Sequence, residues 1–282
     1  MSQTPAYSPP ASLPTIAVLG CGWLGLPLAR ALVKEGYPVN GSTTTPGQLL
    51  TLRDAGIRPF LLRLSPRLSS IDADTLRVLL HDAEVLVLNI PPSRAAGSAE
   101  AYPALLELVV HAASQAGVRH ILHVSSTGVY PDEPRIMHEA DAQASANADA
   151  PMLRAEALFS GPAHTVVRLG GLLGPGRAAG RFLAGRHDLP QGDAPVNLIH
   201  LDDCVGLLQH IIAENSWGHT FNACAANHPT RREFYPLAAS RLGLEPPTFL
   251  SESAGGKIID STLVRSITGY TFRHDDVLAA LA

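Results

Sequence analysis

The string Gly20-Cys21-Gly22-Trp23-Leu24-Gly25 restricts the fold of this chain more than any other feature. It follows the apolar run Thr15–Leu19, which is typical of a buried strand, and it opens the helical pattern Leu24–Glu35. In that setting the first glycine permits a tight turn, the second admits a pyrophosphate, and the third lets the helix pack against the strand. The string therefore predicts a dinucleotide site at a helix N-terminus, formed by Gly20, Gly22, Trp23, Leu24 and Gly25.

Strands and helices continue to alternate up to about residue 169. Apolar runs at Val85–Asn89, Ile121–Val124 and Thr165–Leu169 predict further strands. Continuous apolar strands between helices predict a parallel sheet covered on both faces, so we expect an α/β fold with a Rossmann-type doubly wound sheet. We expect a disordered tail over 1–13, a dinucleotide-binding domain over 14–169, and mostly a smaller C-terminal substrate-side lobe over 170–282.

Composition excludes several classes of partner. The 282 residues carry a net charge of −4, which gives no general electrostatic case for nucleic acid. No apolar run reaches transmembrane length, and residues 1–13 have neither the charge nor the apolar stretch of a signal peptide. The three cysteines are widely spaced, and His120 and His123 would point to opposite faces of a strand. We therefore expect a cytoplasmic protein with no membrane partner and no metal, whose oligomeric state stays open.

The segment Asn40–Thr45 bears on the choice of cofactor. A carboxylate that binds the ribose hydroxyls of NAD usually stands about 20 residues after the glycine string, but this segment contains none. Ser42, Thr43 and Thr44 could instead hydrogen-bond a 2′-phosphate, which favours NADP over NAD. The threonines also suit a helix N-cap before Pro46, and both interpretations can hold together. No arginine is adjacent in the sequence, so both NADP and NAD stay open.

Several motifs in order along the chain resemble a known superfamily. After the glycine string come Ser125–Tyr130, Arg168–Arg177 and Val196–Asp203. Together they resemble the extended short-chain dehydrogenase/reductases, the NAD-dependent epimerase/dehydratase group. Gly22–Gly25 and Gly180–Phe182 are similar, more narrowly, to the atypical YeeZ-like subgroup. The resemblance covers residues 15 to about 275 and implies a Rossmann fold with an NAD(P) cofactor.

The resemblance also implies roles for individual residues. Ser126 matches the position that carries a catalytic or substrate-orienting hydroxyl. The implied cofactor contacts at the nicotinamide end are Asn89, Pro91, Ser125 and Leu169. The implied substrate contacts are Arg177, Arg181, Asn197 and His200. Arginines form bidentate bonds with carboxylate or phosphate, so one interpretation of Arg177 and Arg181 is recognition of a small-molecule substrate that is anionic. A plain surface role for the two arginines is the alternative, and both stay open.

The chain departs from the superfamily at its catalytic pair, Tyr-x-x-x-Lys. None of the six tyrosines is followed four residues later by lysine, and the family register falls on Ala148 and Met152. The usual hydride mechanism thus lacks its proton donor. Tyr130 is a weaker candidate for a replacement acid, because packing at the end of its strand is the favoured interpretation.

Two functions remain open at this point. One is an NAD(P)-dependent oxidoreductase or epimerase/dehydratase-like enzyme, which the pocket-forming loops favour. The other is a non-catalytic NAD(P)-binding redox sensor or partner-binding protein, which the missing pair favours. Whether the chain is an enzyme is therefore undecided by its sequence.

Overall fold

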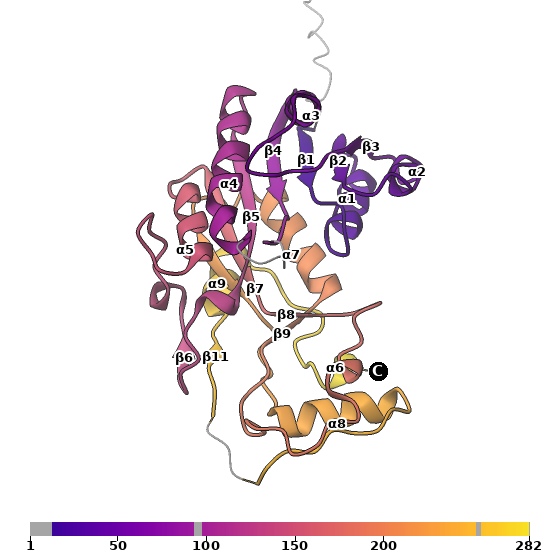
Figure 1. Ribbon diagram of the computed structural model, residues 1–282, viewed down its shortest axis with the longest axis vertical. Coiled ribbons are helices and arrows are strands. Elements are labelled where there is room, and N and C mark those ends of the chain that lie inside the picture. The colour runs from indigo at the N-terminus through magenta and orange to yellow at the C-terminus, as the bar shows by residue number, and fades with distance from the viewer. Residues whose placement is uncertain (1–12, 93–97, 252–254, 282) are drawn as a thin grey trace, which may run out of the picture.

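A seven-stranded parallel sheet forms the centre of the computed structural model, which describes residues 13–92, 98–251 and 255–281 (Figure 1). The spatial order is β10-β7-β5-β4-β1-β2-β3. Strands β1 to β3 are added toward one edge of the sheet and β4, β5, β7 and β10 toward the other, so the strand order reverses between β1 and β4. In open α/β sheets the crevice at such a reversal is where ligands bind. The strands are β1 (Thr15–Leu19), β2 (Val39–Thr43), β3 (Arg58–Leu61), β4 (Ala83–Leu88), β5 (His120–Ser126), β7 (His164–Leu169) and β10 (Thr220–Ala223).

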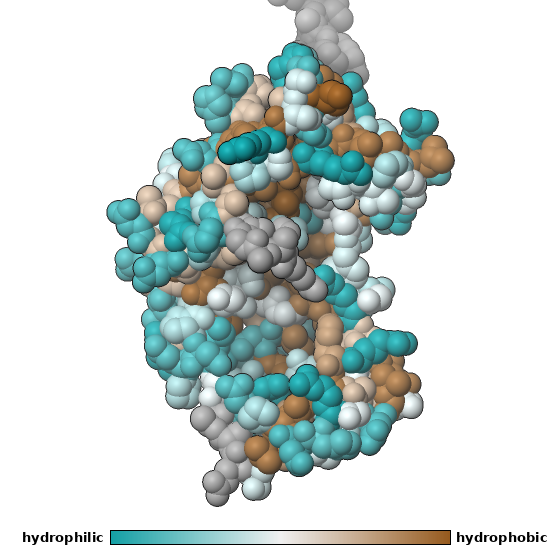
Figure 2. All heavy atoms as spheres, in the orientation of Figure 1, coloured by the Kyte–Doolittle hydropathy of each residue, from teal (hydrophilic) through white to brown (hydrophobic). Residues whose placement is uncertain are grey.

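A smaller lobe lies beyond the carboxyl ends of these strands (Figure 1). The surface is hollowed between the two parts (Figure 2). The helices of this lobe are α6 (Gly180–Leu183) and α8 (Arg231–Arg241), which pack on each other. Its own small core includes Leu173, Phe234 and Ala238. Two short parallel pairs border it: β8 (Gly171–Leu173) with β9 (Leu198–His200), and β6 (Ile136–Met137) with β11 (Ile258–Ile259).

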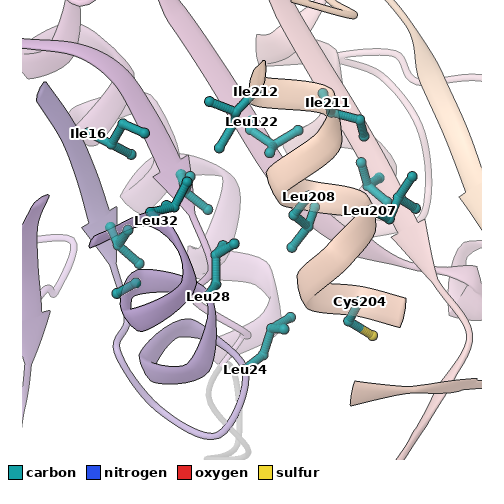
Figure 3. Close-up of a cluster of buried hydrophobic side chains, with 14 of the residues drawn as sticks. Ile16, Leu24, Leu28, Leu32, Leu122, Cys204, Leu207, Leu208, Ile211 and Ile212 are labelled. Atoms are coloured by element: carbon teal, nitrogen blue, oxygen red, sulfur yellow. The ribbon is translucent and has the colours of Figure 1, made fainter. Parts of the chain in front are cut away.

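Helices cover both faces of the sheet because the side chains of each strand alternate between two apolar clusters. In β1, Ile16 and Val18 belong to one cluster, whereas Ala17 and Leu19 belong to the other. The first cluster contains α1 (Gly25–Lys34) and α7 (Leu201–Ala213), whose leucines lie against the sheet in Figure 3. The second cluster contains α3 (Ser70–Leu80), α4 (Ser98–Gln115) and α5 (Pro151–Glu156). The Rossmann-type doubly wound sheet is thus confirmed.

The expected boundary at residue 169, between the dinucleotide-binding domain and the smaller lobe, differs from the structure in one respect. Helix α7 and strand β10, expected in the smaller lobe, belong to the central body: β10 pairs with β7, and α7 packs beside α1. The reason is the apolar face of α7, where Leu207, Leu208, Ile211 and Ile212 are buried. Such a face is stable only against another apolar layer.

The remaining elements are short. Helix α2 (Gln48–Asp54) follows β2, and α9 (Thr262–Thr268) packs near β10. Single 3₁₀ turns are η1 (Thr127–Val129), η2 (Glu139–Asp141), η3 (Ala157–Phe159) and η4 (Ala279–Leu281). Apart from Leu13, the predicted tail over 1–13 lies outside the described residues. Within 13–92, 98–251 and 255–281, no helix is both long and apolar enough to cross a membrane.

Candidate functional site

A cavity of about 570 Å³, called here the main cavity, opens where the strand order reverses. Its walls come from the ends of β1, β2, β4, β5 and β7 and from the loop after β8. Most residues that the sequence assigns to a cofactor line it. These are Gly20, Gly22, Trp23, Leu24, Ser42, Thr43, Thr44, Asn89, Pro91, Ser125 and Leu169, joined by Ser126 and Arg177.

The three glycines of the turn play different steric roles. Gly20 has φ +97°, and a Cβ there would lie 2.3 Å from the carbonyl oxygen of Asn89. A Cβ on Gly25 would lie 2.1 Å from the carbonyl oxygen of Gly20, so Gly25 sets how closely α1 approaches β1. A Cβ on Gly22 would meet no described atom within 4 Å. The backbone at Gly22 therefore stays open to a group that approaches from the main cavity.

Neighbouring strands hold the turn in place. The Ser42 hydroxyl accepts a hydrogen bond from the Gly20 N–H at 3.0 Å, and the Ser42 carbonyl accepts one from the Cys21 N–H at 2.8 Å. On the other side, Asn89 Nδ2 donates to the Gly20 carbonyl at 3.0 Å. Ser42 and Asn89 thus fix the turn. Burial raises the pKa of Cys21 to about 12, so its thiol is not a nucleophile.

The end of β2 meets an arginine that sequence reasoning missed. Thr43 Oγ1 donates to Gln48 Oε1 at 3.3 Å, whereas the Thr44 side chain is exposed. The guanidinium of Arg63 donates to the Thr44 carbonyl at 3.5 Å. Arg63 is 19 residues away in sequence, but the pairing of Thr43 with Leu61 brings it alongside. A prediction of the β2–β3 register would have found it.

Ser126 ends β5 at the rim of the main cavity. Its side chain is exposed, and its Oγ accepts the Gly128 N–H at 3.1 Å, so the hydroxyl proton can be donated to a ligand. Met152 also lines the cavity, whereas Ala148 does not and instead accepts a bond from Arg154 at its carbonyl. Of the two positions in the family register, one therefore faces the cavity.

Tyr130 packs in a buried polar network rather than in the cavity. Its side chain is 3% exposed, and its hydroxyl donates to Asn222 Oδ1 at 2.7 Å and accepts from Arg168 Nη1 at 2.7 Å. Arg168 in turn pairs with Glu156 at 2.6 Å, and Glu156 accepts the Ser125 hydroxyl at 2.5 Å. Burial is the main cause that raises the pKa of Tyr130. Its hydroxyl is thus used structurally.

A tyrosine on another element does reach the main cavity. Tyr102 of α4 lines it, and its hydroxyl donates to the Ile90 carbonyl at 2.7 Å. Burial raises the pKa of Tyr102. Lys257 donates to the backbone carbonyl of Tyr130 at 2.8 Å, not to its hydroxyl. Among the lining residues that the structure describes, no lysine therefore accompanies Tyr102.

The four residues predicted to contact the substrate do not lie together in the structure. Arg177 lines the main cavity, and its guanidinium carbon lies 4.8 Å from the ring centre of Trp23. Trp23 is fixed by a 2.6 Å bond from its indole N–H to the Pro175 carbonyl. Outside the lining, Arg181 lies on α6, and Asn197 bonds the backbone of Lys257 and Ile259.

His200 lies at the N-cap of α7, outside the lining of the main cavity. Its Nδ1 accepts the Asp202 N–H at 3.2 Å, and its ring centre lies 3.9 Å from that of His274. Burial, followed by the neighbouring His274, lowers the pKa of His200. The structure thus brings Arg177 to the main cavity and places His200 with a different set of neighbours.

No family model matches the chain. Protein YeeZ of Escherichia coli strain K12 is 37% identical over 271 residues, which cover 93% of this chain and 97% of YeeZ. The same identity and coverage hold for YeeZ of Escherichia coli O157:H7. The similarity thus extends over nearly the full length of both proteins.

Solved structures with the same fold agree with this relationship. A protein from Methylobacillus flagellatus assigned to the NAD-dependent epimerase/dehydratases has a TM-score of 0.73 at 25% identity, over 95% of this chain and 96% of that one. MoeE5 in complex with UDP-glucose and NAD has a TM-score of 0.72 at 18% identity, with the same coverage. A short-chain dehydrogenase/reductase superfamily protein from Agrobacterium tumefaciens with bound NAD has 0.72 at 17%, over 95% and 94%. The chain therefore belongs to the YeeZ family, and it shares the fold of NAD-dependent epimerase/dehydratases and short-chain dehydrogenase/reductases.

Proposed function

We propose that this protein binds a nicotinamide dinucleotide in the main cavity and acts as an atypical oxidoreductase or epimerase/dehydratase-like enzyme on a small anionic substrate. One observation carries the proposal: a single cavity joins the glycine turn, Ser126 and Arg177. Dinucleotide, reacting oxygen and substrate anion would each have a partner there. MoeE5, which has the same fold, is in complex with NAD and with UDP-glucose, a phosphorylated and therefore anionic molecule. This supports an anionic substrate beside the dinucleotide.

The pyrophosphate would sit at the first turn of α1. The N–H groups of a helix's first turn have no partner within the helix, and the helix dipole favours negative charge there. Gly22 leaves the approach open, whereas Ser42 and Asn89 hold the turn rigid. The cavity thus fits this part of a dinucleotide without rearrangement of the turn.

The adenosine end would lie against β2, where NADP is favoured. Thr44 is exposed, and the adjacent Arg63 could form charge-assisted bonds with a 2′-phosphate. Ser42 contributes through the turn instead, because its hydroxyl already accepts the Gly20 N–H. The preference for NADP thus rests on Arg63 and Thr44.

At the other end, Ser126 would donate a hydrogen bond to the reacting oxygen of the substrate. The nicotinamide, when bound, supplies or accepts the hydride. Arg177, held over Trp23, would bind the anionic group of the substrate. Because the usual tyrosine is missing, we expect carbonyl reduction to be slow, since general acid catalysis contributes about 10²–10⁴-fold.

The test is turnover with reduced cofactor. Purified protein is incubated with NADPH and pooled anionic carbonyl compounds, and the absorbance of the reduced cofactor is followed. We expect slow, sustained oxidation of NADPH that falls at least about tenfold in Ser126→Ala. A Ser145→Ala variant, on the exposed loop before α5, is the control that leaves the rate unchanged. Equal rates in the parent and Ser126→Ala would contradict the role of Ser126.

A non-catalytic NAD(P)-binding sensor is the second candidate. The observation that favours it is Met152, an apolar side chain in the cavity at the family's lysine position. A sensor would bind one equivalent of NADPH and oxidise none with any substrate pool. The same experiment therefore separates the two functions.

A further inference from the structure

Two histidines and an aspartate from distant parts of the chain meet beside the start of α7. His274 Nε2 lies 3.1 Å from Asp202 Oδ2, and His200 Nδ1 lies 3.5 Å from the same oxygen. One ligand atom from each of the three lies within 4.8 Å of the others. His200 is mostly buried, whereas His274 and Asp202 reach solvent.

We propose that His200, Asp202 and His274 form a binding site for a divalent transition-metal ion, with Zn²⁺ as the best match. Four ligands around zinc, at about 2.0–2.1 Å from the ion, stand about 3.3 Å from one another. The two separations of 3.1 and 3.5 Å lie on either side of that value. Two imidazoles and one carboxylate suit zinc, nickel or cobalt rather than magnesium or calcium, which prefer oxygen ligands.

The ligands are held in place by a second aspartate. Asp203 is fully buried and accepts the backbone N–H groups of Arg273 at 2.6 Å and of His274 at 2.9 Å. It also accepts the hydroxyl of Tyr270 at 3.2 Å. These bonds fix the C-terminal segment against the first turn of α7. His274 is thereby positioned before any ion arrives, which lowers the entropic cost of binding.

Two features at the start of α7 affect how strongly the ion would bind. The positive end of the helix dipole disfavours a cation, but Asp202 and Asp203 bring two carboxylates to the same turn. His200 Nδ1 accepts the Asp202 N–H, which must give way if this nitrogen binds the ion. The Asp202 N–H belongs to the first turn of α7, where backbone donors have no partner within the helix, so water would take over that hydrogen bond when the ion binds. Three protein ligands leave the fourth position to water.

The site lies next to the loop after β8, which forms one wall of the main cavity. A Cβ on Gly174 would lie 3.4 Å from His200 Nε2 and 3.4 Å from the Trp23 ring. Gly174 begins the segment that carries Pro175 and Arg177. An ion that fixes His200 would thus support this segment from behind, without entering the main cavity.

The experiment measures binding of the metal alone to protein without a polyhistidine tag. Zn²⁺ is titrated by calorimetry, and Co²⁺ is followed by the visible absorption of its tetrahedral form. We expect one ion per chain and a rise in the thermal midpoint. His274→Ala should weaken binding by at least about tenfold, since even changes around a ligand cost that much.

His187→Ala is the matched control, because His187 also pairs with an exposed carboxylate, that of Glu245 at 3.2 Å. It should leave metal affinity unchanged. Asp202→Asn, at an exposed position, serves as the second variant if His274→Ala is unstable, and it should also lose affinity. The proposal is overturned if no ion binds stoichiometrically, or if the affinity survives in both ligand variants. The metal titration does not depend on dinucleotide binding. A protein that binds zinc but no dinucleotide would contradict the proposed function and leave the metal site intact.

Discussion

At the scale of single residues, substitutions at Gly22 and Gly25 should have different effects: the first on cofactor binding, the second on the stability of the fold. A Cβ at Gly22 would meet no described atom within 4 Å, and a larger side chain there would enter the proposed path of the pyrophosphate. We therefore expect Gly22→Val to abolish NADPH binding, measured by cofactor fluorescence, with the thermal midpoint nearly unchanged. Gly25→Ala, by contrast, forces an atom to within 2.1 Å of the Gly20 carbonyl and should destabilise the protein. Normal NADPH affinity in Gly22→Val would refute the placement of the cofactor.

A second residue, Arg63, decides between NADP and NAD in the proposed site. A hydrogen bond to a charged group contributes about 1.5–3 kcal/mol, so Arg63→Ala should weaken NADPH binding roughly tenfold or more. NADH, which lacks the 2′-phosphate, should bind as before. Titration of both reduced cofactors measures this, with Arg53→Ala in α2 as the control. Tighter binding of NADH than NADPH by the parent protein would show that the preference is reversed.

At the scale of elements, the missing catalytic pair coincides with a change in α5. The family's pair needs one helical turn to bring both side chains to the same face. Here α5 begins at Pro151, so Ala148 precedes the helix and only Met152 lies on it. Proline is favoured in the first turn of a helix but blocks a turn before it, because it lacks an N–H and clashes with the preceding turn.

The double variant Ala148→Tyr/Met152→Lys should therefore not restore a fast reductase. We expect its NADPH oxidation to stay within about tenfold of the parent rate, well below the 10²–10⁴-fold of general acid catalysis. The rate is measured with the same pooled carbonyl compounds, and circular dichroism checks the fold. A hundredfold gain would mean that residues 148 and 152 can still form the pair.

Local elements were predictable from the sequence, and contacts between distant elements were not. The strand–glycine–helix unit depends on adjacent residues, so its position and the steric roles of Gly20 and Gly25 followed from their order. Arg63 escaped because only the register of β2 against β3 brings it to Thr44. His200 and His274 are 74 positions apart, and they meet because buried Asp203 holds the C-terminal segment. Packing of Tyr130 was the favoured interpretation of the sequence, but its hydrogen-bond partners Arg168 and Asn222 are distant and could not be named from it.

At the scale of the whole molecule, one of the contacts between the central body and the loop that leads to the smaller lobe lies at the glycine turn. Trp23 comes from the glycine turn, whereas Pro175 and Arg177 come from the loop that leads toward α6. The contact joins residues 152 positions apart in the sequence. It holds the guanidinium of Arg177, the proposed contact to the substrate anion, 4.8 Å from the ring centre of Trp23 in the glycine turn.

The stability of the whole molecule should fall in mild acid because of a histidine at the centre of the sheet. His123 of β5 is fully buried, stacked on Phe159 with ring centres 4.4 Å apart, and burial lowers its pKa to about 3. An unfolded chain protonates histidine near its ordinary pKa of about 6.5, so the unfolded state binds more protons between about pH 6.5 and 3. The stabilising effect of the neutral ring is therefore complete above about pH 6.5 and is lost progressively as the pH falls toward 3.

Replacement of His123 tests this dependence. Between pH 7 and pH 5, His123 should lower the free energy of unfolding by about 2 kcal/mol. His123→Leu, which is apolar and similar in size, should reduce the difference in the free energy of unfolding between pH 7 and pH 5 by about that amount, measured by urea denaturation. His111→Leu, on the exposed side of α4, is the control and should leave the difference unchanged. An equal acid sensitivity in His123→Leu and the parent would show that His123 is not the group responsible. Burial also lowers the pKa values of His164, His200 and His228.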